Sequence, residues 1–159
     1  MASKKVLITG AAGKIGVAVH QGLRDRYDLR LMYHRNVPAT DGSEEVFVGS
    51  ITDLPRMEEI VDGVDAIVHL AGEPEVDASW ESVMEANIQG IYCLYEAARR
   101  RHVKRIVFAS TNHVTGIYEE EGVYTTAEMP ARPDSYYGAS KAFGEDLGRY
   151  YVDQFGLQV

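Results

Sequence analysis

Hydrophobic residues recur along the chain in two alternating patterns. Short apolar runs rich in Val, Ile, Leu and Phe occur five times, at 6–9, 29–33, 46–48, 66–70 and 105–109. Between these runs, apolar residues recur at helical spacing, as at Ile15, Val19 and Leu23. Strands that alternate with helices are typical of a parallel sheet covered on both faces. The pattern therefore predicts an α/β fold.

Two predicted helices in the middle of the chain have recognisable ends. Thr52 or Asp53 can cap a helix whose first turn contains Pro55, where proline is tolerated. A longer helix is predicted over 79–100, and it ends in a run of arginines that suits a helix C-terminus. Its apolar positions include Val83, Ile88, Tyr92 and Tyr95.

The last third of the chain is predicted to contain a loop, a helix and the start of a strand. Residues 111–133 are rich in Gly, Pro, Thr and acidic residues, which is typical of a surface loop. A helix is predicted over 135–155, with Gly156 as its stop. Residues 157–159 resemble the start of a sixth strand. We therefore expect one domain over 1–159 that is incomplete at its C-terminal end.

Composition narrows the possible partners and locations. The 159 residues are 45% hydrophobic and 25% charged, as in a globular domain. The net charge is −8, and no run of basic residues forms the stripe that binds nucleic acid, so we expect no nucleic-acid partner. Cys93 is the only cysteine, and we expect its side chain to pack inside the protein as a small hydrophobic group. A single cysteine also favours a reducing compartment for the protein. No metal-ligand spacing occurs among the histidines. No apolar run is long enough for a membrane span, and 1–5 lead straight into a strand, so we expect a cytoplasmic protein.

A glycine-rich segment follows the first predicted strand and opens the first predicted helix. It reads TGAAGKIG over 9–16. Gly10 permits a tight turn, Gly13 removes a side chain that would block phosphates, and Gly16 lets the helix and the sheet pack closely. The helix N-terminus offers free N–H groups to a pyrophosphate. An ordinary glycine-rich turn is the alternative, but the strand before it and the helix after it favour dinucleotide binding.

The end of the second predicted strand bears on the choice of cofactor. An acidic residue usually stands there and accepts hydrogen bonds from the ribose hydroxyls of NAD. Here the sequence reads Tyr33, His34, Arg35, and Arg35 could pair with the 2′-phosphate of NADP. Alternatively, Arg35 is a solvated loop charge. Both NAD and NADP remain possible.

Tyr137 and Lys141 lie four residues apart in the last predicted helix, and hence on one face of it. A tyrosine ordinarily loses its proton near pH 10, and a neighbouring cation favours the phenolate. The pair therefore suits proton transfer. The alternative is that an aromatic residue and a lysine share a helix surface by chance.

Polar residues follow the fifth predicted strand at its carboxyl end, where ligands bind in open α/β sheets. They are Ser110, Thr111, Asn112 and His113. We expect the Thr111 hydroxyl to hydrogen-bond a substrate oxygen, and Asn112 and His113 to contact the substrate. Alternatively, these residues satisfy backbone groups of the loop.

Together these motifs resemble the extended short-chain dehydrogenase/reductase superfamily, also described as the NAD-dependent epimerase/dehydratase family. The resemblance rests on TGAAGKIG, HLAG at 69–72, Asn87 in ANIQG, and YGASK at 137–141. Residues 108–116 and 132–151 are similar to uronate dehydrogenases and relatives that oxidise hexose phosphates. The resemblance implies a Rossmann-like doubly wound parallel sheet. It also implies oxidation of the anomeric carbon of a sugar acid or sugar phosphate to a lactone, with hydride passing to NAD or NADP.

The resemblance also implies roles for individual residues. Tyr137 would be the base, Lys141 would favour its phenolate and hold a ribose hydroxyl, Thr111 would orient the sugar hydroxyl, and Asn87 would support a proton relay. Ser50 and Ile51 would lie beside the adenine. The residues expected to contact the cofactor are Gly10, Ala12, Gly13, Lys14, Ile15, Gly16, Tyr33, Arg35, Ser50, Ile51, Leu70, Ala71, Gly72, Tyr137 and Lys141.

Three positions depart from the family pattern. Tyr33 and Ser50 stand where acidic residues are usual, and Thr111 stands where serine is more usual. Two other functions share the same motifs: an epimerase or dehydratase that acts on a nucleotide sugar, and a dinucleotide-sensing module without catalysis. The apolar faces of the two long helices could pair two copies of the chain in a homodimer.

Overall fold

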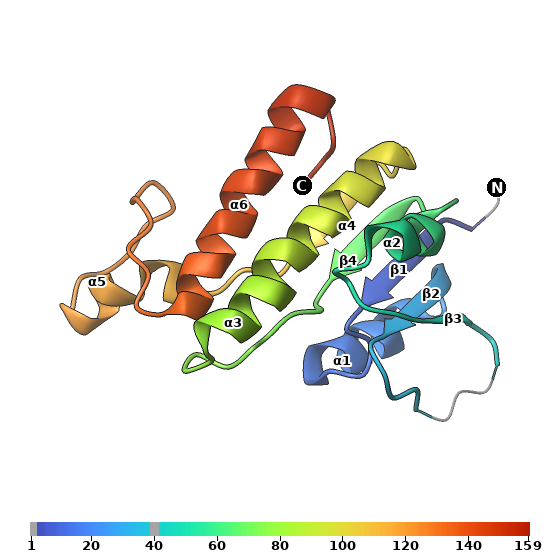
Figure 1. The fold of residues 1–159 in the computed structure, drawn as a ribbon, viewed down its shortest axis with the longest axis horizontal. Coiled ribbons are helices and arrows are strands. Elements are labelled where there is room, and N and C mark those ends of the chain that lie inside the picture. Colours follow the sequence, from blue (N-terminus) through green and yellow to red (C-terminus); the bar gives the residue numbers. More distant parts are fainter. Residues whose placement is uncertain (1–2, 39–41) are drawn as a thin grey trace.

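The computed structural model describes residues 3–38 and 42–159 and contains one parallel sheet (Figure 1). Residues 1–2, at the start of the segment expected to lead into the first strand, lie outside the described part. Its strands are β1 (Lys5–Thr9), β2 (Asp28–Tyr33), β3 (Glu45–Val48), β4 (Ala66–His69) and β5 (Arg105–Phe108). They lie in the order β3-β2-β1-β4-β5. The five predicted strands are confirmed, with ends that differ by one residue at most.

The helices lie on two sides of this sheet. They are α1 (Lys14–Leu23), α2 (Leu54–Val61), α3 (Trp80–Val83), α4 (Gly90–Arg100), α5 (Gly116–Glu120) and α6 (Tyr136–Phe155). A large apolar core joins one face of the sheet to α2, α4 and α6. A smaller core joins the other face to α1. The predicted α/β class is confirmed.

On the face of the sheet that α1 covers, the edge strand β5 has no helix packed against it in the described part of the chain. The Val107 side chain, in the middle of β5, is 55% exposed. Beyond α6, Gln158 forms a single parallel bridge with Arg105, so the chain begins to pair with the outer edge of β5. The expectation of helices on both faces therefore holds over the centre of the sheet and not at β5.

The long central helix is not uniform. Ser79 caps it by accepting a hydrogen bond from the Ser82 amide, as the predicted start requires. Residues Met84–Gln89 then form a π-helical segment between α3 and α4. The wider π turn changes the spacing at which side chains face the core. Within α4, Tyr92 is 46% exposed although it was expected on the apolar stripe, because its neighbours Ile91 and Cys93 face the core instead.

The segment predicted as a loop is partly helical. Asn112–Thr115 form a 3₁₀ helix that leads directly into α5. The Thr111 hydroxyl caps it by accepting from the His113 amide. Gly116 packs so closely on Asp134 that any larger side chain would overlap with its carboxylate. The contact between Gly116 and Asp134 joins separate parts of the chain, so the local composition could not reveal the helix that Gly116 begins.

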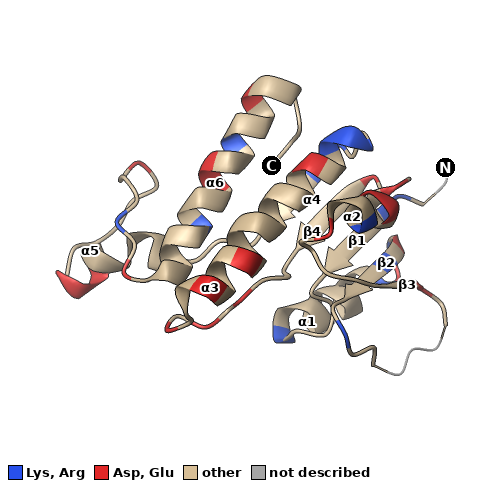
Figure 2. Cartoon of the chain, viewed as in Figure 1, with Lys and Arg blue, Asp and Glu red and all other residues tan. Residues whose placement is uncertain are grey.

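The other predicted helix ends are confirmed, and the arginines at the end of α4 form ion pairs. Asp53 caps α2 and Ser135 caps α6, while Gly156 ends α6 in the left-handed conformation. Figure 2 shows basic residues gathered at the end of α4. There Arg99 and Arg100 pair with Glu96, and Arg100 also pairs with Glu58. Cys93 is buried and is not in a disulfide.

Candidate active site

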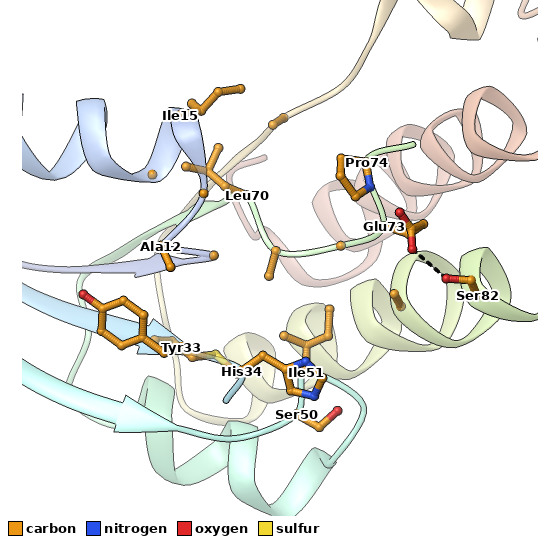
Figure 3. A pocket seen from close by; sticks show the side chains of 18 of the residues that line it. Ala12, Ile15, Tyr33, His34, Ser50, Ile51, Leu70, Glu73, Pro74 and Ser82 are labelled. Atoms are coloured by element: carbon orange, nitrogen blue, oxygen red, sulfur yellow. Dashed lines mark hydrogen bonds between the residues drawn. The ribbon is translucent and has the colours of Figure 1, made fainter. Parts of the chain in front are cut away.

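A cleft of about 810 Å³ opens at the carboxyl ends of the strands (Figure 3). It lies where the strand order reverses, with β1 between β2 and β4, which is where ligands bind in open α/β sheets. Every residue expected to contact the cofactor lines this cleft. The fold therefore brings together residues that span 131 positions from Gly10 to Lys141.

The glycine turn between β1 and α1 forms one wall of the cleft. Gly10 has a φ of +68°, and a Cβ there would lie 2.8 Å from the Ala71 nitrogen. A side chain at Gly16 would overlap with the Gly10 carbonyl. Gly13 is the N-cap residue of α1 and provides no side-chain cap, whereas Asp53 and Ser135 cap their helices. The first N–H groups of α1 are thus left for a ligand, which fits a pyrophosphate.

A buried hydrogen-bond network joins β1 to β4 beneath this turn. The Thr9 hydroxyl lies 2.8 Å from Nδ1 of His69 and accepts hydrogen bonds from the amides of Leu70 and Ala71. Since those amides donate to the oxygen, the hydroxyl proton is directed at Nδ1 of His69. Burial, with a smaller effect from the Lys141 charge, lowers the pKa of His69 to about 3. His69 is therefore neutral and fixes the floor of the cleft.

The end of β2 supplies a second wall. Tyr33 is 4% exposed and belongs to the smaller core, and its phenol ring lies beside Ala12 in Figure 3. Burial, followed by the nearby Glu44 charge, raises the pKa of the Tyr33 phenol. His34 and Arg35 are exposed and face the cleft together with Ser50. Ser50 accepts a hydrogen bond from the Thr52 amide, so its hydroxyl is held in place.

Tyr137 and Lys141 lie on the opposite side, on α6. The Lys141 ammonium donates to the Ala109 carbonyl over 2.9 Å and lies 5.7 Å from the centre of the Tyr137 ring. It also lies 4.9 Å from the Phe108 ring. Burial lowers the pKa of Lys141 to about 8. A partly desolvated cation beside a phenol favours loss of the phenol proton.

Close packing holds α6 against the sheet. A Cβ on Gly144 would lie 2.5 Å from Cζ of Phe108, and one on Gly138 would overlap with the His113 carbonyl. Both glycines are buried. The helix can approach β5 and the segment after it only because these positions carry no side chain.

The residues expected to contact the substrate lie beside the cleft and not in its lining. His113 Nδ1 lies 2.7 Å from an Asp134 oxygen, and the His113 ring meets the Tyr137 ring edge-on. Asn112 donates to Glu119. Thr111 uses its hydroxyl as the cap described above. These polar groups therefore satisfy their own segment, while their neighbour Ser110 reaches the cleft.

Asn87 also lies outside the lining. Its amide nitrogen donates to the Glu73 carbonyl over 3.1 Å and to the Ser140 hydroxyl over 2.9 Å. Its amide oxygen accepts from the Glu73 amide over 2.7 Å. Asn87 thus ties the loop after β4 to α6, next to Lys141.

Sequence reasoning missed the far end of the cleft. The segment after HLAG, α3 and the π-helical segment contribute the side chains of Glu73, Pro74, Glu75, Ser82, Glu85 and Ala86. Glu73 accepts a hydrogen bond from Ser82 over 2.7 Å, and Figure 3 shows this pair together with Pro74. The signal was available, because Glu73 follows β4 at the carboxyl edge of the sheet, as Ser110 follows β5.

Two searches of the described residues concern metals and membranes. Among residues 3–38 and 42–159, no group of three or more His, Cys, Asp or Glu side chains could hold a metal ion. Within the same ranges, no helix has the length and apolar character to cross a bilayer.

The fold and the cleft define a doubly wound α/β protein with a dinucleotide-type glycine turn and a tyrosine–lysine pair. Residues 6–159 match the model of the NAD dependent epimerase/dehydratase family. The chain belongs to that family, as its motifs predicted.

The most similar relatives include sugar dehydrogenases. Over 98% of the chain, identity is 43% to uronate dehydrogenase of Pseudomonas syringae pv. tomato and 42% to L-arabinose 1-dehydrogenase (NAD(P)(+)) of Haloferax volcanii. A solved uronate dehydrogenase variant from Agrobacterium tumefaciens, complexed with NAD, superposes with a TM-score of 0.88 at 39% identity over 98% of the chain. The chain spans 56%, 64% and 58% of these proteins, respectively.

Proposed function

We propose that the protein is an NAD(P)-dependent dehydrogenase that oxidises the anomeric carbon of a sugar acid or sugar phosphate to a lactone. The observation that carries this proposal is the shared cleft, in which Tyr137 and Lys141 face the glycine turn of β1 and α1. Similarity to uronate dehydrogenase and to L-arabinose 1-dehydrogenase supports the substrate class.

The cleft fits a dinucleotide in two respects. The side-chain-free turn at Gly10 and Gly13 leaves backbone N–H groups for the pyrophosphate, and the cleft continues to Tyr137 for the nicotinamide. The bound nicotinamide supplies the hydride acceptor. The chain supplies orientation at the turn and a place for the proton at the Tyr137 oxygen.

In this mechanism Tyr137 takes the proton from the anomeric hydroxyl as general base. Lys141 stabilises the phenolate through its charge, and the Ala109 carbonyl fixes the position of its ammonium. We assign Thr111, Asn112 and His113 to the substrate side, because His113 already contacts the Tyr137 ring. Asn87 acts as a positioning residue next to this pair. Both of its N–H groups donate and its oxygen accepts one hydrogen bond, so we assign its support of a proton relay to the placement of its partners.

The decisive experiment mixes the full-length protein with NAD or NADP and a panel of hexuronates, hexose phosphates and neutral sugars. Reduced cofactor should accumulate with at least one sugar. An epimerase would keep its cofactor bound and release no reduced form, and a sensing module would bind cofactor without any turnover. Absence of signal across the panel would discard the dehydrogenase function.

The Tyr137→Phe variant tests the base. It should lower the oxidation rate by at least about a hundredfold, as expected for loss of a general base, and leave the dissociation constant of the cofactor nearly unchanged. The dissociation constant can be measured by calorimetry. Persistent activity in this variant would show that another group takes the proton.

The proposal includes a cytoplasmic location and a homodimer. The single reduced Cys93 is consistent with a reducing compartment. The two long helices carry exposed aromatic and apolar side chains on α3, the π-helical segment, α4 and α6. These are Trp80, Met84, Tyr92, Tyr136, Phe143, Tyr150 and Phe155. A second copy of the chain would remove them from water.

A further inference from the structure

Two neighbouring residues after β5 are joined to α6 by hydrogen bonds of opposite polarity. The Ala109 carbonyl accepts from the Lys141 ammonium over 2.9 Å. The next residue, Ser110, donates its hydroxyl proton to the carboxylate of Glu145. Glu145 follows Lys141 by four residues, so the two side chains lie on the same face of α6, one helical turn apart. The segment after β5 is therefore attached to two successive turns of this helix.

Ser110 depends on its side chain for this attachment. The last backbone hydrogen bond from the segment to β4 joins the Ala109 amide to the His69 carbonyl over 3.3 Å. Among the described residues, no hydrogen bond joins the Ser110 backbone to the sheet. A peptide unit is planar, so the Ala109 carbonyl and the Ser110 amide turn together. Fixing Ser110 therefore also fixes the direction of the Ala109 carbonyl.

Glu145 has no second partner that would compete for its carboxylate. Within the described part of the chain, its side chain forms no ion pair and accepts no other hydrogen bond. Arg149, one turn further along α6, pairs with Asp153 instead. A carboxylate only accepts, and a hydrogen bond from a hydroxyl to an ionised acceptor is stronger than one between neutral groups. Ser110 and Glu145 are both exposed, so this pair can be altered without opening the core.

We infer that Glu145 is a positioning residue, which acts through Ser110 to hold the Lys141 ammonium in place. The link between them is the Ala109 carbonyl. Glu145 lines a second cavity at the edge strand β5 and not the cofactor cleft, whereas Ser110 lines both. The inference rests on the proposed function only in taking the lysine as the cation that favours the phenolate of Tyr137. Since a misplacement of about 1 Å can slow catalysis about a hundredfold, loss of this link should slow the chemical step.

The first test follows the Lys141 side chain by NMR of the full-length protein with isotope-labelled lysine, and Lys141→Met assigns its signal. The Cε resonance senses the two aromatic rings whose centres lie 4.9 and 5.7 Å from the ammonium. Glu145→Ala and Ser110→Ala should each shift this resonance. Glu145→Gln retains an oxygen that accepts from the hydroxyl and should preserve it. Asp146→Ala is the control and should change nothing, because this exposed side chain on α6 forms no hydrogen bond or ion pair with any described residue.

Kinetics on the sugar that the full-length protein oxidises provide the second test. Glu145→Ala and Ser110→Ala should each lower kcat by about tenfold to a hundredfold and leave KM for the sugar within about threefold. The double variant should be no slower than the slower single variant, since both changes remove the same hydrogen bond.

The outcomes separate this inference from the proposed function. An unchanged Lys141 resonance in both alanine variants would overturn the positioning role, even if these variants were less stable. A resonance that shifted equally in Glu145→Gln and Glu145→Ala would contradict the hydrogen-bonded route through Ser110. A full-length protein that oxidised no sugar would overturn the proposed function, whereas a shifted resonance in the alanine variants would still support the link from Glu145 to Lys141.

Discussion

The ammonium of Lys141 is buried between the Phe108 ring and the Ala109 carbonyl. Burying a cation costs free energy, and the structure offsets this cost with one carbonyl and two ring faces. No carboxylate accepts from Lys141 among the hydrogen bonds of the described residues. A carboxylate there would hold the charge more firmly, but it would also cancel the field that favours ionisation of Tyr137. The burial of the Lys141 ammonium without a carboxylate partner is thus consistent with a catalytic role for this charge.

The Lys141 environment predicts a pH-dependent stability. Its pKa is about 8 in the folded protein, below the ordinary 10.5, so between these values the unfolded chain retains a proton that the folded chain has lost. Across that window the free energy of unfolding should rise with pH by up to about 1.4 kcal/mol per pH unit from this group. Urea unfolding of the wild type and of Lys141→Met, measured from pH 7 to 10, isolates the contribution of Lys141 to the pH dependence of the free energy of unfolding. A constant difference between the two proteins would contradict the assignment.

At the scale of elements, α6 determines the geometry of the site because its glycines allow contact with β5. Gly144→Ala would place a methyl group 2.5 Å from Phe108 Cζ, and should destabilise the protein by about 1–3 kcal/mol through overpacking. Gly22→Ala is the matched control, since that exposed position in α1 has nothing within 4 Å of the added carbon. It should stabilise by about 0.5–1 kcal/mol. Chemical denaturation measures both, and equal effects would refute the packing argument.

Elements fixed by local patterns were predicted from the sequence, and those fixed by distant contacts were not. The strands follow from apolar runs, and Asp53, Ser135 and Gly156 mark helix ends through local hydrogen bonding and backbone conformation. In the π-helical segment, Asn87 forms hydrogen bonds to Glu73 and Ser140, which lie outside the segment in sequence. Periodicity alone could not reveal it.

The same distinction holds for the candidate site. Tyr137 and Lys141 were found because the two residues lie one helical turn apart. The glycine turn was found because a strand precedes it and a helix follows it. The acidic end with Glu73 and Glu85 was missed. The position of Glu73 after β4 was a usable signal, whereas Glu85 lies in a helical segment without a recognisable motif. Thr111 was assigned to substrate, yet its hydroxyl caps the 3₁₀ helix in this structure.

For the whole molecule, the exposed aromatic surface on the long helices predicts self-association. Phe143→Glu and Tyr150→Glu should each convert a dimer to a monomer in sedimentation experiments on the full-length protein, because a charge would be buried between copies. Tyr124→Glu is the control, as Tyr124 is 91% exposed and lies outside these helices. A monomeric wild type would remove the homodimer from the proposal.

Tyr33 belongs to the smaller core and to the wall of the cleft at once. A point mutation to aspartate at this position would bring a charge to the edge of the smaller core and should therefore lower the stability of this protein. His34 and Arg35 carry no such burden. Substitutions that alter this wall of the cleft should therefore be tolerated more readily at these two exposed positions than at Tyr33.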